Sequence, residues 1–162
     1  MLASGVLLGL IAGLAVGRRW RPLATVEIRW LPVLIGSLVA RALASFVGPI
    51  AFPLYVLALG GTVASAAANV RLTGAVLVAI GGGLNLLVVL LNQGMPVDLG
   101  AVAAAAATMP TDRLHVVASE VTVLRPLADV IPVGIAHAVY SVGDFVIALG
   151  GFVVPFVLLV RR

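Results

Sequence analysis

Three polar side chains lie inside long apolar stretches of this 162-residue chain, where few polar groups are tolerated. They are Arg41, Asn85 and Asp144, which carry a guanidinium, a carboxamide and a carboxylate. At about 1.5 Å per helical residue, each is expected about 9–10 Å below the same membrane surface. Charged groups at that depth are costly unless they pair or line a cavity. We therefore predict an Arg41–Asp144 ion pair to which Asn85 adds hydrogen bonds.

Two interpretations of this polar cluster stay open. It locks three helices together, as polar groups between membrane helices often do. Alternatively, it forms a small site for an anion, a lipid headgroup, a quinone-like ring or a protein partner. A polar stripe extends the cluster, because His137, Ser141 and Asp144 follow at i, i+4 and i+7 on one expected helix face, with Tyr140 alongside.

The stripe contains residue types that are used in nucleophilic catalysis, but side chains on one straight helix face rarely converge. No strained G-x-S-x-G turn surrounds Ser141. Ser-Val-Gly-Asp at 141–144 is similar to the G-x-G-D of intramembrane aspartyl proteases, yet it lacks the first glycine and a second membrane carboxyl to share a proton. His115 and His137 match no metal-ligand spacing. We predict no catalytic residue and no metal, and the sequence identifies no cofactor.

Composition places the chain in a lipid bilayer. Hydrophobic residues make up 62% and charged residues 10%, with a mean hydropathy of +1.24, whereas about a quarter of an ordinary soluble domain is charged. Cysteine is absent, which excludes disulfides and thiolate sites. The net charge of +4 does not indicate nucleic acid, because the arginines follow a membrane-topology pattern instead.

The predicted fold is all-α: a single membrane domain over 1–162, with five transmembrane helices and a partly helical extracytoplasmic loop. Apolar runs long enough to cross about 30 Å of hydrocarbon cover about 2–17, 31–48, 50–68, 72–91 and 135–160. When the spans alternate, one side receives most of the arginines, namely Arg18, Arg19, Arg21, Arg29, Arg71, Arg161 and Arg162. Arginine-rich short loops stay cytoplasmic. We therefore expect a multi-pass protein of the cell membrane with its N-terminus outside and its C-terminus inside.

The first span carries a glycine at every fourth position, a stripe that allows backbone contact with another helix. Its members are Gly5, Gly9, Gly13 and Gly17. The stripe packs either internally, against the Gly36, Ala40 and Ala44 face of the second span, or against another copy or another membrane protein. The fourth span contains Gly81–Gly83, which either permit close packing or mark a broken helix.

The loop at about 92–134 is expected to cap the outer mouth of the bundle. Asp98 is placed to cap a short alanine-rich helix that reaches Ala107 and ends by Pro110. The polar or turn-forming residues singled out there as binding candidates are Asn92, Met95, Pro96, Asp98, His115 and Asp129.

An ordered series of short motifs carries a family resemblance. It consists of Asn92 with Gly-Met-Pro-Val at 94–97, His115, Leu-Ala-Asp-Val-Ile-Pro at 127–132, and Tyr-Ser-Val-Gly-Asp at 140–144. The chain resembles a family of small bacterial multi-pass membrane proteins classified as a domain of unknown function. This resemblance implies the same five-span outline and supplies no activity or catalytic residue.

Three functions remain open from the sequence. The leading one is a non-enzymatic protein, either an accessory or scaffold subunit of a membrane complex or a binder of a small ligand at the outer leaflet. Its expected partners are the lipid bilayer and either further copies of itself or a larger membrane complex. The alternatives are a small transporter or channel that uses the polar cluster, and a membrane hydrolase or transferase.

Overall fold

The computed structural model describes residues 1–17 and 25–160, and most of these are helical. The long helices are α1 (Leu2–Gly17), α3 (Leu31–Ala44), α4 (Ala51–Ala68), α5 (Ala75–Asn92) and α7 (Val142–Val160). Three stretches are long and apolar enough to cross a membrane: Gly48–Ala68, Ala75–Asn92 and Val142–Val160. The other two apolar helices, α1 and α3, are shorter.

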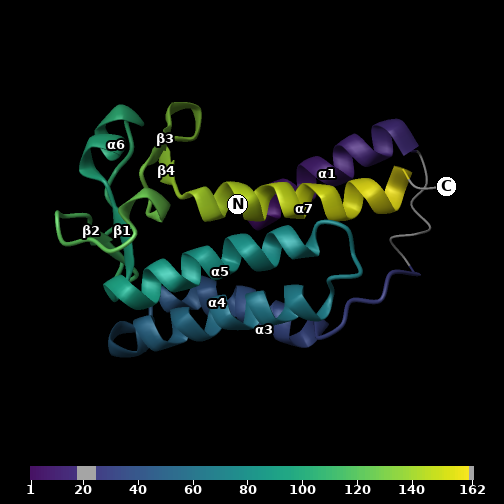
Figure 1. The fold of residues 1–162 in the computed structure, drawn as a ribbon, viewed down its shortest axis with the longest axis horizontal. Coiled ribbons are helices and arrows are strands. Elements are labelled where there is room, and N and C mark those ends of the chain that lie inside the picture. Colours follow the sequence, from purple (N-terminus) through teal and green to yellow (C-terminus); the bar gives the residue numbers. More distant parts are fainter. Residues whose placement is uncertain (18–24, 161–162) are drawn as a thin grey trace.

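The long helices form a layered bundle in which α3 packs on α4, α4 on α5, α5 on α7, and α7 on α1 (Figure 1). Residues 93–141 gather at one end of this bundle, which we call the loop end. The opposite end, which holds the connection Asn69–Gly74 between α4 and α5, is called the turn end. The spatial order of the long helices therefore follows the sequence order from α3 through α4 and α5 to α7, and only α1 is displaced, because it packs on α7.

The glycine stripe of α1 faces α7, and the expected packing against the 31–48 helix is wrong. A methyl group added at Gly5 or Gly9 would overlap the backbone carbonyl of Ala148 or Phe152, respectively. Rising residue numbers on α1 meet rising numbers on α7, so the two helices run in the same direction. Within the described part of the chain, a methyl group added at Gly36 of α3 would meet nothing within 4 Å.

The glycine triplet of α5 serves packing, because α5 is an unbroken helix from Ala75 to Asn92. Gly81 lies against Gly143 and Ile147 of α7, and Gly82 lies against Val63 of α4. The same short segment thus brings both neighbouring helices close to α5.

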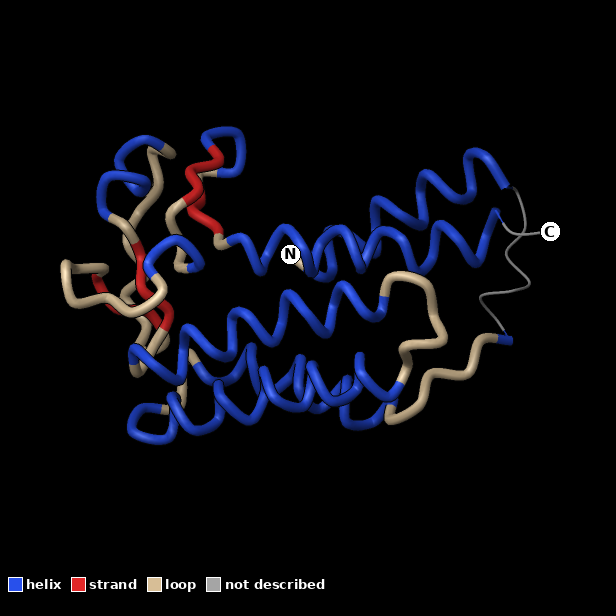
Figure 2. Tube along the Cα trace, viewed as in Figure 1, coloured by secondary structure: helices blue, strands red, loops and turns tan. Residues whose placement is uncertain are grey.

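The loop end adds small strands, so the all-α prediction is too simple there (Figure 2). Strands β1 (Met95–Val97) and β2 (His115–Val117) pair in parallel, and β3 (Ile131–Val133) and β4 (Ala138–Tyr140) form an antiparallel hairpin. Helix α6 (Leu99–Ala104) lies between β1 and β2 in sequence, and three short 3-10 helices occur at Gly48–Ile50, Arg125–Leu127 and Gly134–Ala136.

Asp98 caps α6 as predicted, since its carboxylate accepts a hydrogen bond from the Ala101 N–H at 3.0 Å. The helix ends at Ala104 instead of Ala107. Shortly after this end, Ala106 adopts a left-handed backbone conformation (φ 49°).

The predicted start of the fifth span at residue 135 is wrong, because α7 begins at Val142. Pairing of β3 with β4 draws the apolar residues 138–140 into a hairpin, and His137 occupies the left-handed region at its turn (φ 46°). His137 and Tyr140 therefore do not share a helix face with Ser141 and Asp144. The second predicted span also ends early, at Ala44 rather than 48.

Several predictions fall on positions outside the described residues. These are the topology signals at Arg18, Arg19, Arg21, Arg161 and Arg162. The packing of Gly17, the last residue of α1, is likewise not described.

The loop is anchored to the bundle by a buried apolar core and by side-chain hydrogen bonds. Tyr55, Val88 and Met95 belong to that core. Asn92 holds the backbone of Val123 from both sides, accepting from its N–H at 2.9 Å and donating to its carbonyl at 3.0 Å. These contacts fix the loop end relative to α4 and α5.

Candidate functional site

The first polar unit at the loop end is the start of α7. Ser141 precedes the helix, and its hydroxyl accepts a hydrogen bond from the Asp144 N–H at 3.0 Å. The Asp144 carboxylate in turn accepts from the Ser141 N–H at 3.3 Å. This reciprocal pair is a capping box, in which two otherwise unpaired helix donors are satisfied. In the sequence, the S-x-x-D spacing at 141–144 before an apolar run already indicates such a capping box, besides its similarity to a protease motif.

Asn85 of α5 joins this cap to the neighbouring helix. Its carboxamide oxygen accepts from the Ser141 hydroxyl at 2.9 Å, and its amide nitrogen donates to Asp144 at 3.1 Å. Ser141 is fully buried and Asn85 is 4% exposed. Gly143 makes the contact feasible, because any side chain there would overlap the Asn85 carboxamide. The predicted meeting of Asn85 with Asp144 is present, with Ser141 as the third member.

Arg41 does not form the predicted ion pair with Asp144. Among the described residues, the ion pairs within 4 Å are Asp112–His115 and Asp98–Arg125. The Arg41 guanidinium lies instead over the ring of Tyr55, with 4.6 Å from its central carbon to the ring centroid. A buried aromatic face attracts a cation through its quadrupole. Tyr55 is 4% exposed. The sequence alone did not identify it as the partner of Arg41.

Asp129 is the most unusual carboxyl group of the loop end. Its backbone bridges β1, since its N–H donates to the Pro96 carbonyl and its own carbonyl accepts from the Asp98 N–H. The side chain is 7% exposed, and its Oδ1 has no hydrogen-bond partner in the described structure. Burial and the nearby Asp144 raise the pKa of Asp129 to about 8, against the opposing effect of Arg41. At neutral pH this group is therefore mostly protonated.

A cavity of about 130 Å³ lies beside Asp129. It is enclosed by the segments around β1, α6, β2 and β4, and its polar lining residues are Thr108, His115, Asp129 and His137. His137 is exposed, and its Nδ1 lies 3.3 Å from the Ala106 carbonyl oxygen. The structure thus brings three of the sequence candidates, His115, Asp129 and His137, to one cavity.

His115 is positioned by Asp112, with 2.6 Å between Nδ1 and Oδ1. Burial alone would raise the pKa of Asp112, but hydrogen bonds from His115, the Leu114 N–H and Ser45 hold the pKa below its ordinary value. A carboxylate that stays ionised fixes the Nδ1 side of the ring as a donor. The Nε2 atom is then the part of His115 left for other contacts.

The remaining loop candidates have structural contacts. Met95 and Pro96 are buried in β1, and Asn92 holds Val123. Asp98 caps α6 and accepts from Arg125 at 2.7 Å, a hydrogen bond that lowers the pKa of Asp98. None of these side chains lines the cavity beside Asp129.

The hydrogen bonds of Ser141 go to Asn85 and Asp144, and no hydrogen bond in the described structure joins Ser141 to His137. Residues 1–17 and 25–160 contain no group of three or more histidine or acidic side chains that could hold a metal ion. The Ser141 hydroxyl therefore takes part in the helix cap and in the contact with α5.

Comparison with known proteins gives one family. A family model described as a family of unknown function (DUF5317) matches residues 24–156. No curated protein and no solved structure matches the chain.

Proposed function

The chain belongs to the DUF5317 family, whose function is unknown, and we propose from its own residues that it is a membrane protein that binds a small polar ligand at the loop end. The supporting observation is the buried, unpartnered Oδ1 of Asp129 beside a cavity that two histidines also line. A buried polar atom without a partner costs about 1–3 kcal/mol. A ligand that supplies the missing hydrogen bond would recover that free energy.

The membrane placement is part of the proposal. Helices α1 and α3 expose large apolar side chains along their length, including Ile11 at 58% and Ile35 at 52%. Such surfaces are stable only against lipid or another apolar surface. We therefore propose five membrane helices, with α1 and α3 embedded beside the three longer ones. In the sequence, the connections from α1 to α3 and from α4 to α5 carry Arg18, Arg19, Arg21, Arg29 and Arg71, whereas the segment 93–141 carries Arg113 and Arg125, and this excess supports a cytoplasmic turn end and an outward loop end.

The cavity limits the ligand to a few heavy atoms. At about 30 Å³ per water molecule, 130 Å³ holds about four water molecules or a molecule of similar bulk. The best very small ligands gain about 1.5 kcal/mol per heavy atom, so four atoms give at most about 6 kcal/mol and a Kd between micromolar and millimolar. Protonated Asp129 would donate to this ligand, and the His115 Nε2 would donate or accept.

The test is a ligand-observed NMR screen of small polar fragments against the full chain in lipid nanodiscs. Binding at millimolar concentration that is lost in Asp129→Ala and His137→Ala, but kept in the exposed-loop control Glu120→Gln, would support the proposal. Fragments that bind these variants and the unchanged protein equally, or no binding at all, would overturn it.

A transporter remains a second candidate on one specific observation. Burial and the charge of Asp144 raise the pKa of Asp129 to about 8, and Arg41 opposes this shift; Asp144 and Arg41 belong to α7 and α3. Uptake of a proton by Asp129 at the loop end would therefore change the electrostatic interaction of this group with Asp144 and Arg41 in the bundle. Proton flux into liposomes that persists unchanged in Asp129→Asn would remove this candidate. An accessory role in a larger complex rests on the exposed faces of α1 and α3, because the glycine stripe is already occupied by α7.

A further inference from the structure

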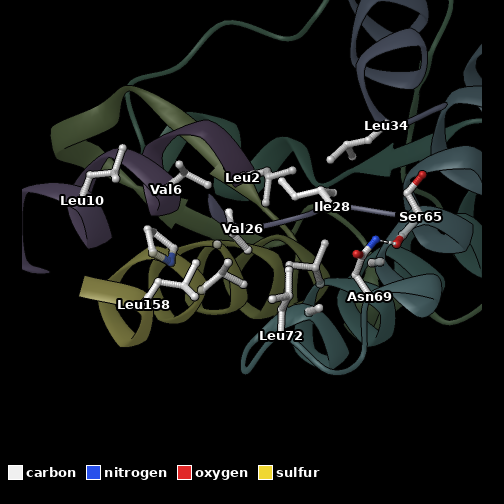
Figure 3. Close-up of a pocket in the computed structure, with 16 residues that line it drawn as sticks. Leu2, Val6, Leu10, Val26, Ile28, Leu34, Ser65, Asn69, Leu72 and Leu158 are labelled. Atoms are coloured by element: carbon white, nitrogen blue, oxygen red, sulfur yellow. Dashed lines mark hydrogen bonds between the residues drawn. The ribbon is translucent and has the colours of Figure 1, made fainter. Parts of the chain in front are cut away.

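A second cavity, of about 260 Å³, lies near the turn end and is separate from the loop-end site. Its walls come from α1, α3, α4, α5, α7 and the segment that contains Val26 and Ile28 (Figure 3). Nearly every lining side chain is apolar, including Leu2, Leu10 and Leu158. An engineered apolar cavity of about 150 Å³ binds benzene, so this one accepts a longer hydrocarbon group.

Two polar residues, Ser65 and Asn69, mark one edge of the cavity. Figure 3 shows Ser65 of α4 and Asn69, which directly follows α4, at this edge, away from Leu10. Ser65 is 1% exposed, and its hydroxyl has no hydrogen-bond partner within the described part of the chain. Asn69 is satisfied, because it bonds the Ser65 carbonyl and both backbone groups of Arg29. Both polar side chains are enclosed by the protein, so the surface that the cavity presents to a ligand is apolar.

Two arginines lie next to this polar edge. Asn69 holds the backbone of Arg29, and Arg71 follows Asn69 by two residues and donates to the Glu27 carbonyl at 2.6 Å. Both arginine residues are exposed. Each cation near a membrane surface attracts anionic lipid.

We propose that this cavity binds one acyl chain of an anionic phospholipid. The acyl chain occupies the space between the apolar walls, and the phosphate lies beside Arg29 and Arg71. These two features match the hydrocarbon and the charged headgroup of such a lipid. The ligand class follows from this match of apolar volume and positive charge.

The experiment titrates phosphatidylglycerol or phosphatidylcholine into the full chain in mild detergent and measures bound lipid by native mass spectrometry. Phosphatidylglycerol is expected to bind more tightly, and Arg71→Gln should weaken it about fivefold. Arg113→Gln, an exposed arginine at the loop end, is the matched control and should change nothing.

Cavity filling separates this site from general lipid contact. Ala66 lines the cavity, whereas its neighbour Ala67 is exposed on the same helix. Ala66→Phe should abolish phosphatidylglycerol retention, and Ala67→Phe should preserve it. Equal retention in both variants, or equal binding of the two lipids by the unchanged protein, would overturn the proposal. If Ala66→Phe fails to fold, as judged by circular dichroism, the Arg71→Gln comparison decides alone.

Discussion

Replacing Ser141 by alanine tests whether the start of α7 is held by the contacts described above. The change removes the helix cap, which costs about 0.5–2 kcal/mol. It also removes the hydrogen bond to Asn85 at 2.9 Å, and such bonds between membrane helices contribute about 0.6 kcal/mol on average and up to about 1.7. The free energy of unfolding should therefore fall by about 1–4 kcal/mol, the sum of these two ranges.

A double-mutant cycle with Asn85→Ala separates the two contributions. The capping hydrogen bond lies within α7 and does not involve Asn85, whereas the inter-helix bond requires both side chains. Equilibrium unfolding in mixed micelles, followed by circular dichroism, should give a coupling free energy of about 0.6–1.7 kcal/mol between the two sites. Ser119→Ala, at an exposed loop serine, is the control and should stay within about 0.5 kcal/mol of the unchanged protein.

Additive effects in this cycle would refute a stabilising hydrogen bond between Ser141 and Asn85, which connects the start of α7 to α5. A Ser141→Ala protein as stable as the Ser119→Ala control would refute the capping box as well. The two results are distinguishable, because the first concerns the coupling and the second concerns the single variant.

Three further predictions follow from packing, charge and burial. Gly9→Ala should destabilise the protein by about 1–3 kcal/mol, because its methyl group would overlap the Phe152 carbonyl. Gly36→Ala, which places a methyl group in open space on α3, should stabilise the protein by about 0.5–1 kcal/mol. Unfolding in micelles measures both changes. The Asp129 carboxyl should titrate near pH 8 by carbon NMR. Because the folded pKa of Asp129 is raised, its carboxyl contributes fully to the free energy of unfolding at low pH. This contribution falls by about 1.4 kcal/mol per pH unit as the pH rises from the unfolded pKa to the folded pKa of about 8. Asp129→Asn should abolish this dependence of stability on pH. Arg41→Gln and Tyr55→Leu should show a coupling of about 0.5–2 kcal/mol, whereas Arg41→Gln with Asp144→Asn should be additive.

Counting residues along helices predicted one contact correctly but could not predict directions around the helix axis. The rise per residue brought Asn85 and Asp144 together, and they share a hydrogen bond. The same counting paired Arg41 with Asp144, although its side chain turns toward Tyr55 on α4. The rise per residue fixes the position of a side chain along the helix axis. Its partner depends in addition on the rotation of the helix about that axis and on which helices are its neighbours.

Long apolar runs predicted helix positions well, and short apolar segments did not. The apolar run predicted at about 2–17 is the helix α1 (Leu2–Gly17), because a helix pairs the backbone groups of such a run within the segment itself. Residues 135–141 are also mostly apolar, and periodicity alone cannot distinguish a short strand from a helix. Their pairing with β3 is a non-local contact. The neighbour of the glycine stripe was missed for the same reason, since α1 and α7 come from opposite ends of the sequence.

Each of the two proposed sites is lined by one residue with a buried, unpartnered polar atom. Among the buried side-chain polar atoms of the described residues, two lack a hydrogen-bond partner, the Ser65 hydroxyl and the Asp129 Oδ1. Native proteins pair nearly all such atoms, because each unpaired one costs about 1–3 kcal/mol. Each of the two lines its own cavity, one near the turn end and one at the loop end. Occupancy of one cavity should therefore be separable from occupancy of the other, since no lining residue is shared between them.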